Sequence, residues 1–242
     1  MFADKVVLIT GSTRGIGNET ALKFAAAGFR VVVTYYRNQL EGEQVQQECL
    51  RSGAPNVLLL KLDVADSESV RQAVSQIIQA FGRIDILVNN AGILVHKYLQ
   101  EQSLEDIRRQ LQTNLEGVIA MTKACLPYIK ECIINVGSTA ALRGHKNQTV
   151  YAATKFGVRG FTQSLARELP QIRVYVVNPG MVATRMTEFR GISAGLVAAI
   201  IYNAAVGKYQ VPSGGDINIQ DYLSGSPAGY LRSLFNWFKM KG

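Results

Sequence analysis

The feature of this sequence that most constrains its fold is an alternation between short apolar runs and longer amphipathic stretches. The apolar runs, which are rich in β-branched residues, are Val6–Thr10, Val31–Tyr35, Val57–Leu62, Ile84–Val88, Ile133–Val136 and Arg173–Val177. Runs of this kind are typical of strands that are buried on both faces of a parallel sheet. A last strand is expected at Asp216–Gln220.

The stretches between these runs have helical periodicity. Ser67–Phe81 places Val70 and Val74 on one face, and Val150–Leu169 is a second long example. Strand and helix in regular alternation predict a doubly wound parallel sheet with right-handed crossovers, that is, an α/β Rossmann fold with three α/β/α layers. The chain has 242 residues, of which 48% are hydrophobic, and it has no Pro/Gly-rich linker. We therefore expect residues 1–242 to form a single domain.

Composition argues against several other classes of protein. Cys49, Cys125 and Cys132 are odd in number and lack metal-ligand spacing, so we expect no metal site and a reducing, cytoplasmic compartment. The N-terminal residues do not have the pattern of a signal peptide. No stretch approaches the roughly 18 apolar residues of a membrane-spanning helix. We therefore expect no transmembrane segment.

The charge of the chain is unevenly distributed. The net charge is +8, and all of the excess lies in residues 141–242, which hold 12 basic and 4 acidic residues. An anionic partner is one explanation, and solvated surface charge together with neutralisation of cofactor phosphates is the other. No pattern of basic residues interleaved with stacking aromatic residues is present, so we expect no nucleic-acid partner.

A glycine-rich turn joins the first expected strand to a helix at Ile16–Ala27. Gly11, Gly15 and Gly17 give the spacing G-x-x-x-G-x-G, whereas the usual dinucleotide fingerprint is G-x-G-x-x-G. Gly11 can make the tight turn, Gly15 can let the backbone approach a ligand, and Gly17 can let the helix pack closely. The helix N-terminus would then offer N–H groups to a pyrophosphate. A purely structural turn is the alternative.

The end of the second expected strand indicates which dinucleotide binds. NAD-binding units usually have an acidic residue there, but this strand is followed by Tyr36 and Arg37, with no acid before Glu41. Arg37 could pair with a 2′-phosphate, and Arg14 could reach the same group. This favours NADP(H) over NAD(H). The alternative is that Arg37 begins a solvated loop.

Three polar residues form a candidate catalytic group. Tyr151 and Lys155 are four residues apart and share one face of a helix, and Ser138 lies just past the strand at Ile133–Val136. A nearby ammonium favours the phenolate and lowers the pKa of a tyrosine, so Tyr151 could exchange a proton near neutral pH. Ser138 could donate a hydrogen bond to the same substrate oxygen.

In this combination the sequence resembles the short-chain dehydrogenase/reductase family, and in particular 3-oxoacyl-[acyl-carrier-protein] reductases. The similarity extends from about Val6 to Thr184 and resumes near Asp216. The family's motifs match, in order, T-G-x-x-x-G-I-G at Thr10–Gly17, an Asp at Asp63 followed by Val64, N-N-A-G at Asn89–Gly92, the tetrad Asn114, Ser138, Tyr151 and Lys155, and P-G-x-x-x-T at Pro179–Thr184.

The resemblance implies a role for each matching residue. Tyr151 would be the general acid in reduction and the base in oxidation, while Lys155 would lower the pKa of Tyr151 and hold the ribose. Ser138 would orient the carbonyl. Asn114 would hold a water that links Lys155 to solvent, or it would simply bend its helix. The cofactor-binding residues would be Gly11, Ser12, Thr13, Arg14, Gly15, Ile16, Gly17, Tyr36, Arg37, Asp63, Val64, Asn90, Ala91, Gly92, Tyr151, Lys155, Pro179, Gly180, Val182 and Thr184.

The chain also departs from the family pattern. Gly137, rather than a second serine, precedes Ser138, and the last strand lacks the family's V-D-G-G ending. Residues 185–207 would form a short apolar substrate lid or an ordinary core helix. Residues 229–242 would form a basic amphipathic tail, which could contact a membrane surface or pack on protein. By analogy with the family, we expect a homodimer or homotetramer.

These observations together predict an NADP-dependent oxidoreductase that reduces a ketone or aldehyde to an alcohol. Two substrate classes remain open, a 3-oxoacyl group on an acidic carrier protein and a free small carbonyl compound. Arg143, Arg159, Arg167 and Arg173 could face such a carrier. A protein that only senses NADP is the non-enzyme alternative, although such proteins usually lose the tyrosine or the lysine.

Overall fold

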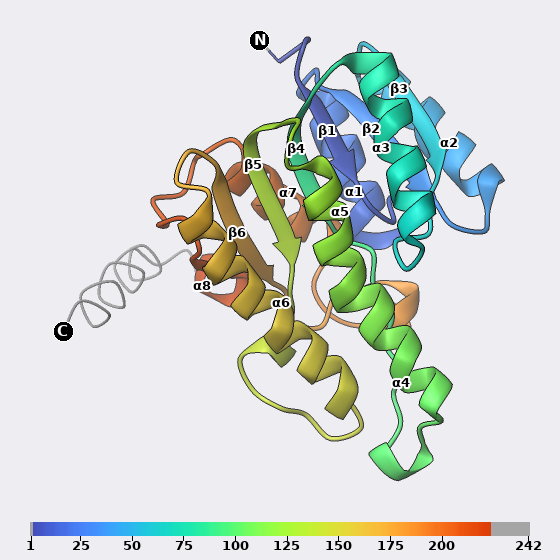
Figure 1. Ribbon diagram of the computed structural model, residues 1–242, viewed down its shortest axis with the longest axis vertical. Coiled ribbons are helices and arrows are strands. Elements are labelled where there is room, and N and C mark those ends of the chain that lie inside the picture. The colour runs from blue at the N-terminus through green and yellow to red at the C-terminus, as the bar shows by residue number, and fades with distance from the viewer. Residues whose placement is uncertain (1, 224–242) are drawn as a thin grey trace.

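The computed structural model describes residues 2–223, in which seven parallel strands form one sheet (Figure 1). The order across the sheet is β3-β2-β1-β4-β5-β6-β7. The strands are β1 (Val6–Ile9), β2 (Arg30–Tyr35), β3 (Val57–Lys61), β4 (Ile84–Asn89), β5 (Ile129–Val136), β6 (Arg173–Asn178) and β7 (Asp216–Asn218). The predicted doubly wound Rossmann sheet is therefore confirmed. The predicted tail at 229–242 lies outside the described residues.

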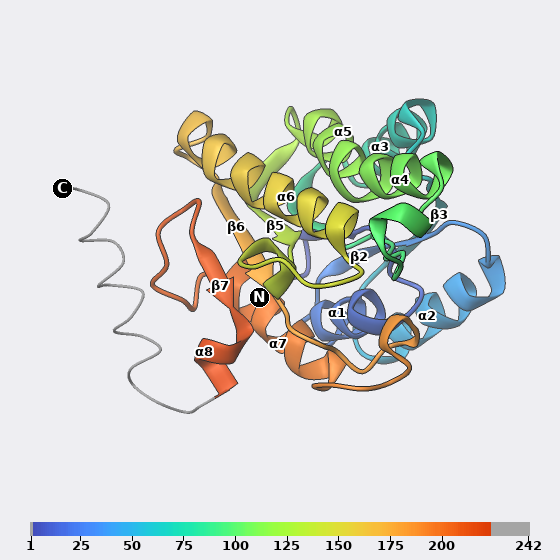
Figure 2. The same cartoon turned by 90° about the horizontal axis from the view of Figure 1, so that it is seen from below.

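Helices cover both faces of the sheet, which gives the three expected layers (Figure 2). On one face lie α1 (Gly15–Ala26), α2 (Gln39–Arg51) and α7 (Ala194–Ala205). On the other face lie α3 (Ser67–Phe81), α5 (Gly117–Cys125) and α6 (Thr149–Glu168), with α4 (Leu104–Leu111) leading into α5. A short helix, α8 (Ile219–Leu223), follows the last strand. None of the helices within residues 2–223 is long and apolar enough to cross a membrane.

The strands serve two cores because successive side chains point to opposite faces of the sheet. In β1, Val7 and Ile9 pack in the cluster that contains Phe24 of α1, whereas Val6 and Leu8 pack in the cluster that contains Met121 of α5. All four residues of β1 are fully buried. Burial on both faces explains why the strands are continuous apolar runs rather than alternating ones.

The strand order changes direction between β1 and β4. From β1 the chain proceeds outward to β2 and β3, and it then returns to β4 on the other side of β1. A crevice at the carboxyl ends of the strands forms at such a switch point, and ligands of doubly wound sheets bind there. The topology thus brings the turn after β1 and the residues after β4 to one edge of the sheet.

Three elements differ from their expected form. β5 begins at Ile129 and includes Lys130 and Glu131 at its solvent end, so its first residues lack the apolar signature. The last strand ends at Asn218 instead of continuing to position 220, because Ile219–Leu223 form the helix α8. Residues 194–205 of the expected lid form α7, whose Val197 and Ile201 are fully buried, as in the alternative of a core helix.

Candidate active site

Tyr151, Lys155 and Ser138 lie together at the carboxyl end of β5. Tyr151 and Lys155 are one turn apart on α6, and the Nζ of Lys155 lies 5.6 Å from the centre of the Tyr151 ring. The same Nζ donates a hydrogen bond of 2.8 Å to the carbonyl oxygen of Val136, the last residue of β5. Ser138 is two residues further on, and its side chain is near enough to Tyr151 to lower the pKa of that phenol. The structure therefore brings the three predicted side chains together.

The pKa values of these groups are set mainly by burial. Burial raises the pKa of Tyr151, and the nearby Ser138 side chain acts in the opposite direction. Burial lowers the pKa of Lys155 to about 8. The predicted lowering of the Tyr151 pKa by the ammonium is wrong for the protein without ligand, because burial raises the pKa of this phenol. The neutral phenol is thus favoured at neutral pH, which is the form that donates a proton.

Asn114 lies on a π-helical turn, Gln112–Glu116, between α4 and α5. Its side chain is fully buried and forms a pair of 2.8 Å hydrogen bonds with the backbone of Ile93, and it donates to Thr154 Oγ1 at 3.3 Å. A Cβ placed on Gly92 would lie 3.3 Å from Asn114 Oδ1 and 3.9 Å from Lys155 Nζ. Asn114 and Lys155 therefore flank the same backbone position. Turns of this type often occur at functional sites, and the sequence had indicated only that Asn114 could bend its helix.

The glycine-rich turn has the shape of an anion cradle. Gly11 and Gly15 have φ values of +64° and +57°, which side-chain-bearing residues rarely adopt. A Cβ on Gly17 would overlap the carbonyl oxygen of Gly11 and lie 2.5 Å from Asn90 Nδ2, so the helix can approach the turn only without a side chain there. No side chain caps the first turn of α1. Its first N–H groups and partial positive charge are therefore available to an anion, which fits a diphosphate.

Threonine and asparagine side chains hold this turn in place. Thr10 Oγ1 accepts hydrogen bonds from the N–H groups of Asn90 and Ala91 at 2.9 and 3.0 Å. Asn90 Nδ2 donates to the carbonyl oxygens of Thr10 and Gly11. Thr34, from the end of β2, accepts from the N–H of Gly11 at 2.9 Å. Asn90 was among the predicted site residues, whereas Thr34 was not, because a hydroxyl at the end of a strand gives no distinctive signal in the sequence.

The residues predicted to contact the nucleoside lie around the end of β2 and β3. Arg37 is exposed, and its guanidinium lies 4.9 Å from the centre of the Tyr36 ring. Arg14, the residue before α1, is exposed as well. Asp63 is partly buried, and its Oδ1 accepts a hydrogen bond from the N–H of Ala65. Both arginines are therefore free to bind an anion.

The segment after β6 folds back over the glycine turn. A Cβ on Gly15 would lie 3.0 Å from Thr184 Cγ2, so the end of the predicted P-G-x-x-x-T motif lies beside the start of α1. Next to it, Arg185 pairs with Glu41 of α2 at 3.1 Å. These contacts connect residues more than 140 positions apart in the sequence, and the ion pair was not predicted.

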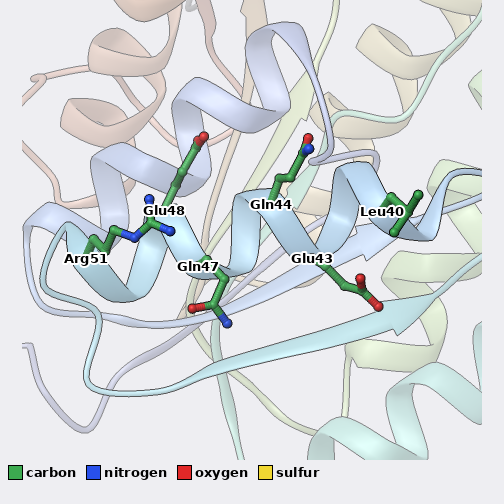
Figure 3. Close-up of a pocket in the computed structure, with 6 residues that line it drawn as sticks. All are labelled: Leu40, Glu43, Gln44, Gln47, Glu48 and Arg51. Carbon is green, nitrogen blue, oxygen red and sulfur yellow. The ribbon is translucent and has the colours of Figure 1, made fainter.

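The outer face of α2 carries a shallow depression away from these groups (Figure 3). Its lining consists of Leu40, Glu43, Gln44, Gln47, Glu48 and Arg51. All six belong to one helix, so the depression is the space between the side chains of a solvent-facing surface and we assign it no ligand. Within residues 2–223, no three His, Cys, Asp or Glu side chains are grouped as a metal site would require.

Comparisons with known proteins agree with this geometry. The family model described as short chain dehydrogenase matches residues 5–192. The 3-oxoacyl-[acyl-carrier-protein] reductase of Synechocystis is 40% identical over 190 residues, which is 76% of each chain. The trans-4-hydroxycyclohexanecarboxylate dehydrogenase of Sinomonas cyclohexanicum is 38% identical, over 76% of this chain and 75% of that protein. A short chain dehydrogenase from Burkholderia cenocepacia, solved in complex with NADP, has a TM-score of 0.83 and 31% identity, over 90% of this chain and 96% of that one.

Proposed function

This chain belongs to the short-chain dehydrogenase/reductase family of oxidoreductases, and we propose that it uses NADPH to reduce a ketone to an alcohol, with Tyr151 as the proton donor. The observation that carries the proposal is the grouping of Tyr151, Ser138 and Lys155 at the carboxyl edge of the sheet, beside an uncapped helix N-terminus. When bound, the nicotinamide supplies the hydride. The protein must then bind, orient and protonate the substrate.

The proton-transfer step follows from the environment of Tyr151. Because burial raises the pKa of this phenol, it stays protonated at neutral pH and can give its proton to the oxygen that gains charge during reduction. The Ser138 hydroxyl can donate a hydrogen bond to the same oxygen. Lys155, beside the ring, stabilises the phenolate left behind. We propose that Asn114 holds a water through which this proton is replaced from solvent.

The roles proposed for the cofactor-binding residues follow the family's motifs and the places of these residues at the carboxyl edge of the sheet. The turn at residues 11–17 would hold the pyrophosphate, and Asp63 with Val64 would hold the adenine. The segment after β4, Asn90–Gly92, would line the ribose, and Pro179–Thr184 would hold the nicotinamide amide. Exposure of Arg37 next to Tyr36 supports a bound 2′-phosphate.

We propose a 3-oxoacyl thioester on a carrier protein as the substrate class. Similarity to a 3-oxoacyl-[acyl-carrier-protein] reductase supports this choice. Fewer arginines are available to an acidic carrier than the sequence suggested, because Arg159 pairs with Asp216 and Arg173 lies 4.0 Å from Glu131. Arg143 and Arg167 are exposed and remain available to an acidic partner.

A free cyclic or small carbonyl compound is the second candidate substrate. The similarity to a trans-4-hydroxycyclohexanecarboxylate dehydrogenase favours it. The salt dependence of activity separates the two. Turnover of a carrier-linked substrate should fall steeply with ionic strength, because a charged docking surface is screened. A response to salt no steeper than that of the free thioester would contradict the carrier.

Replacement of Tyr151 by Phe tests the proposed proton donor. With a panel of carbonyl compounds that includes a 3-oxobutanoyl thioester, we expect kcat to fall about 10²- to 10⁴-fold, while fluorescence titrations show that the variant still binds NADPH. Tyr128→Phe, at the opposite end of the sheet, is the matched control and should retain activity. Full activity of Tyr151→Phe would refute the assignment. Binding of NADPH without turnover of any carbonyl by the unmodified protein would favour a cofactor sensor.

Replacement of Arg37 by Ala tests the cofactor preference. Loss of a charge-assisted contact should raise the Kd for NADPH about 10- to 100-fold and leave the Kd for NADH unchanged. An equal change for both cofactors would show that Arg37 does not read the 2′-phosphate.

An oligomer is the last element of the proposal. The continuous helix formed by α4 and α5 exposes Leu104, Leu111 and Ile119, and α6 exposes Phe156. Apolar side chains in such number on neighbouring helices support association of like subunits. Sedimentation velocity should give a dimer or tetramer, and a monomer at micromolar concentration would contradict it.

A further inference from the structure

A buried side chain supports the backbone of Ser138. The carboxamide of Asn178, the last residue of β6, is fully buried, and its Oδ1 accepts a hydrogen bond of 3.2 Å from the Ser138 N–H. The neighbouring N–H groups of Gly137 and Thr139 donate to backbone carbonyls of the segment that includes β6, at 2.8 and 2.9 Å. The N–H groups of three consecutive residues, 137 to 139, thus bond to the segment of β6, and of these three only the Ser138 N–H bonds to a side chain.

An ion pair fixes the direction of this carboxamide. Nδ2 of Asn178 donates to Asp216 Oδ1 at 2.9 Å and to Asn218 Oδ1 at 3.1 Å. A carboxylate can only accept hydrogen bonds, so Nδ2 must face Asp216 and Oδ1 must face Ser138. Asp216 is held in turn by Arg159, whose Nε and Nη2 donate to its two oxygens at 2.8 to 2.9 Å.

The residue before the serine leaves room for this arrangement. A Cβ on Gly137 would overlap Asn178 Oδ1 and would lie 2.7 Å from Val176 Cγ2. The space that a side chain would take at position 137 is therefore occupied by the Asn178 carboxamide. A serine at position 137 would not fit beside Asn178 in this arrangement, so the glycine before Ser138 and the buried Asn178 go together.

The chain of contacts joins two parts of the proposed site. Arg159 lies on α6, one turn beyond Lys155 and two turns beyond Tyr151, and Ser138 lies at the end of β5. The path Arg159, Asp216, Asn178, Ser138 thus connects the helix that carries the proton donor to the residue that orients the carbonyl. It uses side chains from two further strands, β6 and β7.

We propose that Asn178 is a positioning residue for Ser138, and that the Arg159–Asp216 pair sets the direction of its carboxamide. This inference rests on the proposed function, since it assigns Asn178 a role only through the Ser138 hydroxyl. Loss of the carboxamide frees the backbone at position 138, so the hydroxyl samples other directions and the substrate oxygen loses an oriented donor.

A double-mutant cycle between Asn178 and Ser138 tests the proposal. With NADPH and a 3-oxobutanoyl thioester, Asn178→Ala should lower kcat/KM about 10-fold, whereas in a Ser138→Ala background it should lower it less than about 3-fold. The Kd for NADPH should stay within about 3-fold throughout, and thermal denaturation should confirm that each variant is folded. An equal loss in both backgrounds, or no loss in either, would overturn the positioning role.

A second set of variants tests the ion pair. Asn178→Asp keeps the shape but places two carboxylates side by side, so it should lose at least as much activity as Asn178→Ala. Adding Asp216→Asn to it restores a donor opposite an acceptor and should recover several-fold of the loss. Arg159→Gln should lower kcat/KM by about 3-fold or more, while Arg51→Gln, on α2 at the other edge of the sheet, should not. Absence of recovery, or equal effects of the two arginine variants, would overturn the role of the pair.

The same experiment separates this inference from the proposed function. If Ser138→Ala alone leaves kcat/KM unchanged, the proposed role of the serine fails, and the positioning role fails with it. If Ser138→Ala loses activity but the Asn178 variants do not, the proposed function stands and only the positioning role falls.

Discussion

The two sides of the crevice are stabilised in different ways. On the side of β1 and β4, uncharged groups such as Thr10, Thr34 and Asn90 bind mostly to backbone atoms. On the side of β5, β6 and β7, the support is a side-chain network that ends in the ion pair of Arg159 with Asp216. On the first side, each of these hydrogen bonds has a backbone atom as one partner. On the second side, the hydrogen bonds of the network join one side chain to another.

Replacing a glycine by alanine on each side allows the two kinds of support to be compared. At both Gly17 and Gly137 an added Cβ would overlap an existing atom. At Gly17 the overlapped atom is the backbone carbonyl oxygen of Gly11, which belongs to a turn with positive φ. At Gly137 the overlapped atoms belong to side chains, the end of Asn178 and the Cγ2 of Val176. A backbone atom cannot move without distorting the turn, whereas a carboxamide can change its rotamer. A similar overlap should therefore destabilise the protein more at Gly17 than at Gly137.

Gly17→Ala should have the largest effect of the changes considered. The added methyl group must push the start of α1 away from the turn, so we expect the free energy of unfolding to fall by about 3 kcal/mol and NADPH binding to be lost. Urea denaturation and fluorescence titration measure the two quantities. Gly160→Ala on α6 is the control, because a Cβ there meets no atom within 4 Å. Wild-type affinity in Gly17→Ala would show that the turn is not a rigid cradle.

Gly137→Ala should affect the other side of the crevice more mildly and more selectively. The new methyl group displaces the Asn178 carboxamide from the Ser138 N–H, which removes about one hydrogen bond. We expect kcat/KM to fall about 10-fold, with unfolding free energy lowered by about 1 to 2 kcal/mol and the Kd for NADPH nearly unchanged. A loss of cofactor affinity as large as that of Gly17→Ala would remove the contrast between the two sides.

The same contrast explains what could be predicted from the sequence. The glycine turn and the Tyr151–Lys155 pair are local patterns, because a turn and a helix fix the relation between residues a few positions apart. Asn178 and Asp216 are 38 residues apart and meet only because β6 and β7 pair, so no spacing rule identifies them. The alternation of strands and helices predicted the sheet, but the π-helical turn at Asn114 depends on tertiary contacts with Ile93 and Thr154.

Lys155→Met should change how stability depends on pH. The pKa of Lys155 is lowered from 10.5 to about 8 in the folded protein, so between these values the unfolded state binds more protons and stability rises with pH. From about pH 8 to about pH 9.5, the unfolding free energy of the wild type should gain about 1.5 kcal/mol relative to Lys155→Met. Urea denaturation of the protein without ligand measures this difference.

An exposed lysine provides the reference for that measurement. Lys123→Met, on α5, should follow the wild-type pH profile, because its ammonium is solvated in both states. Parallel profiles for Lys155→Met and the wild type would show that Lys155 keeps its ordinary pKa. In that case burial would not control its charge in the site.

Glu41→Gln should have the smallest effect, although it breaks an ion pair that spans the glycine-turn side. Arg185 is 61% exposed at its side chain, so water and salt weaken its 3.1 Å contact with Glu41. We expect the free energy of unfolding to change by less than about 0.5 kcal/mol at low salt, and by less at high salt. Glu48→Gln on the same helix is the control, and urea denaturation of both variants is the measurement. If Glu41→Gln, but not Glu48→Gln, lowered the free energy of unfolding by more than about 1 kcal/mol, an ion pair would stabilise the glycine-turn side as well as the side of Asp216.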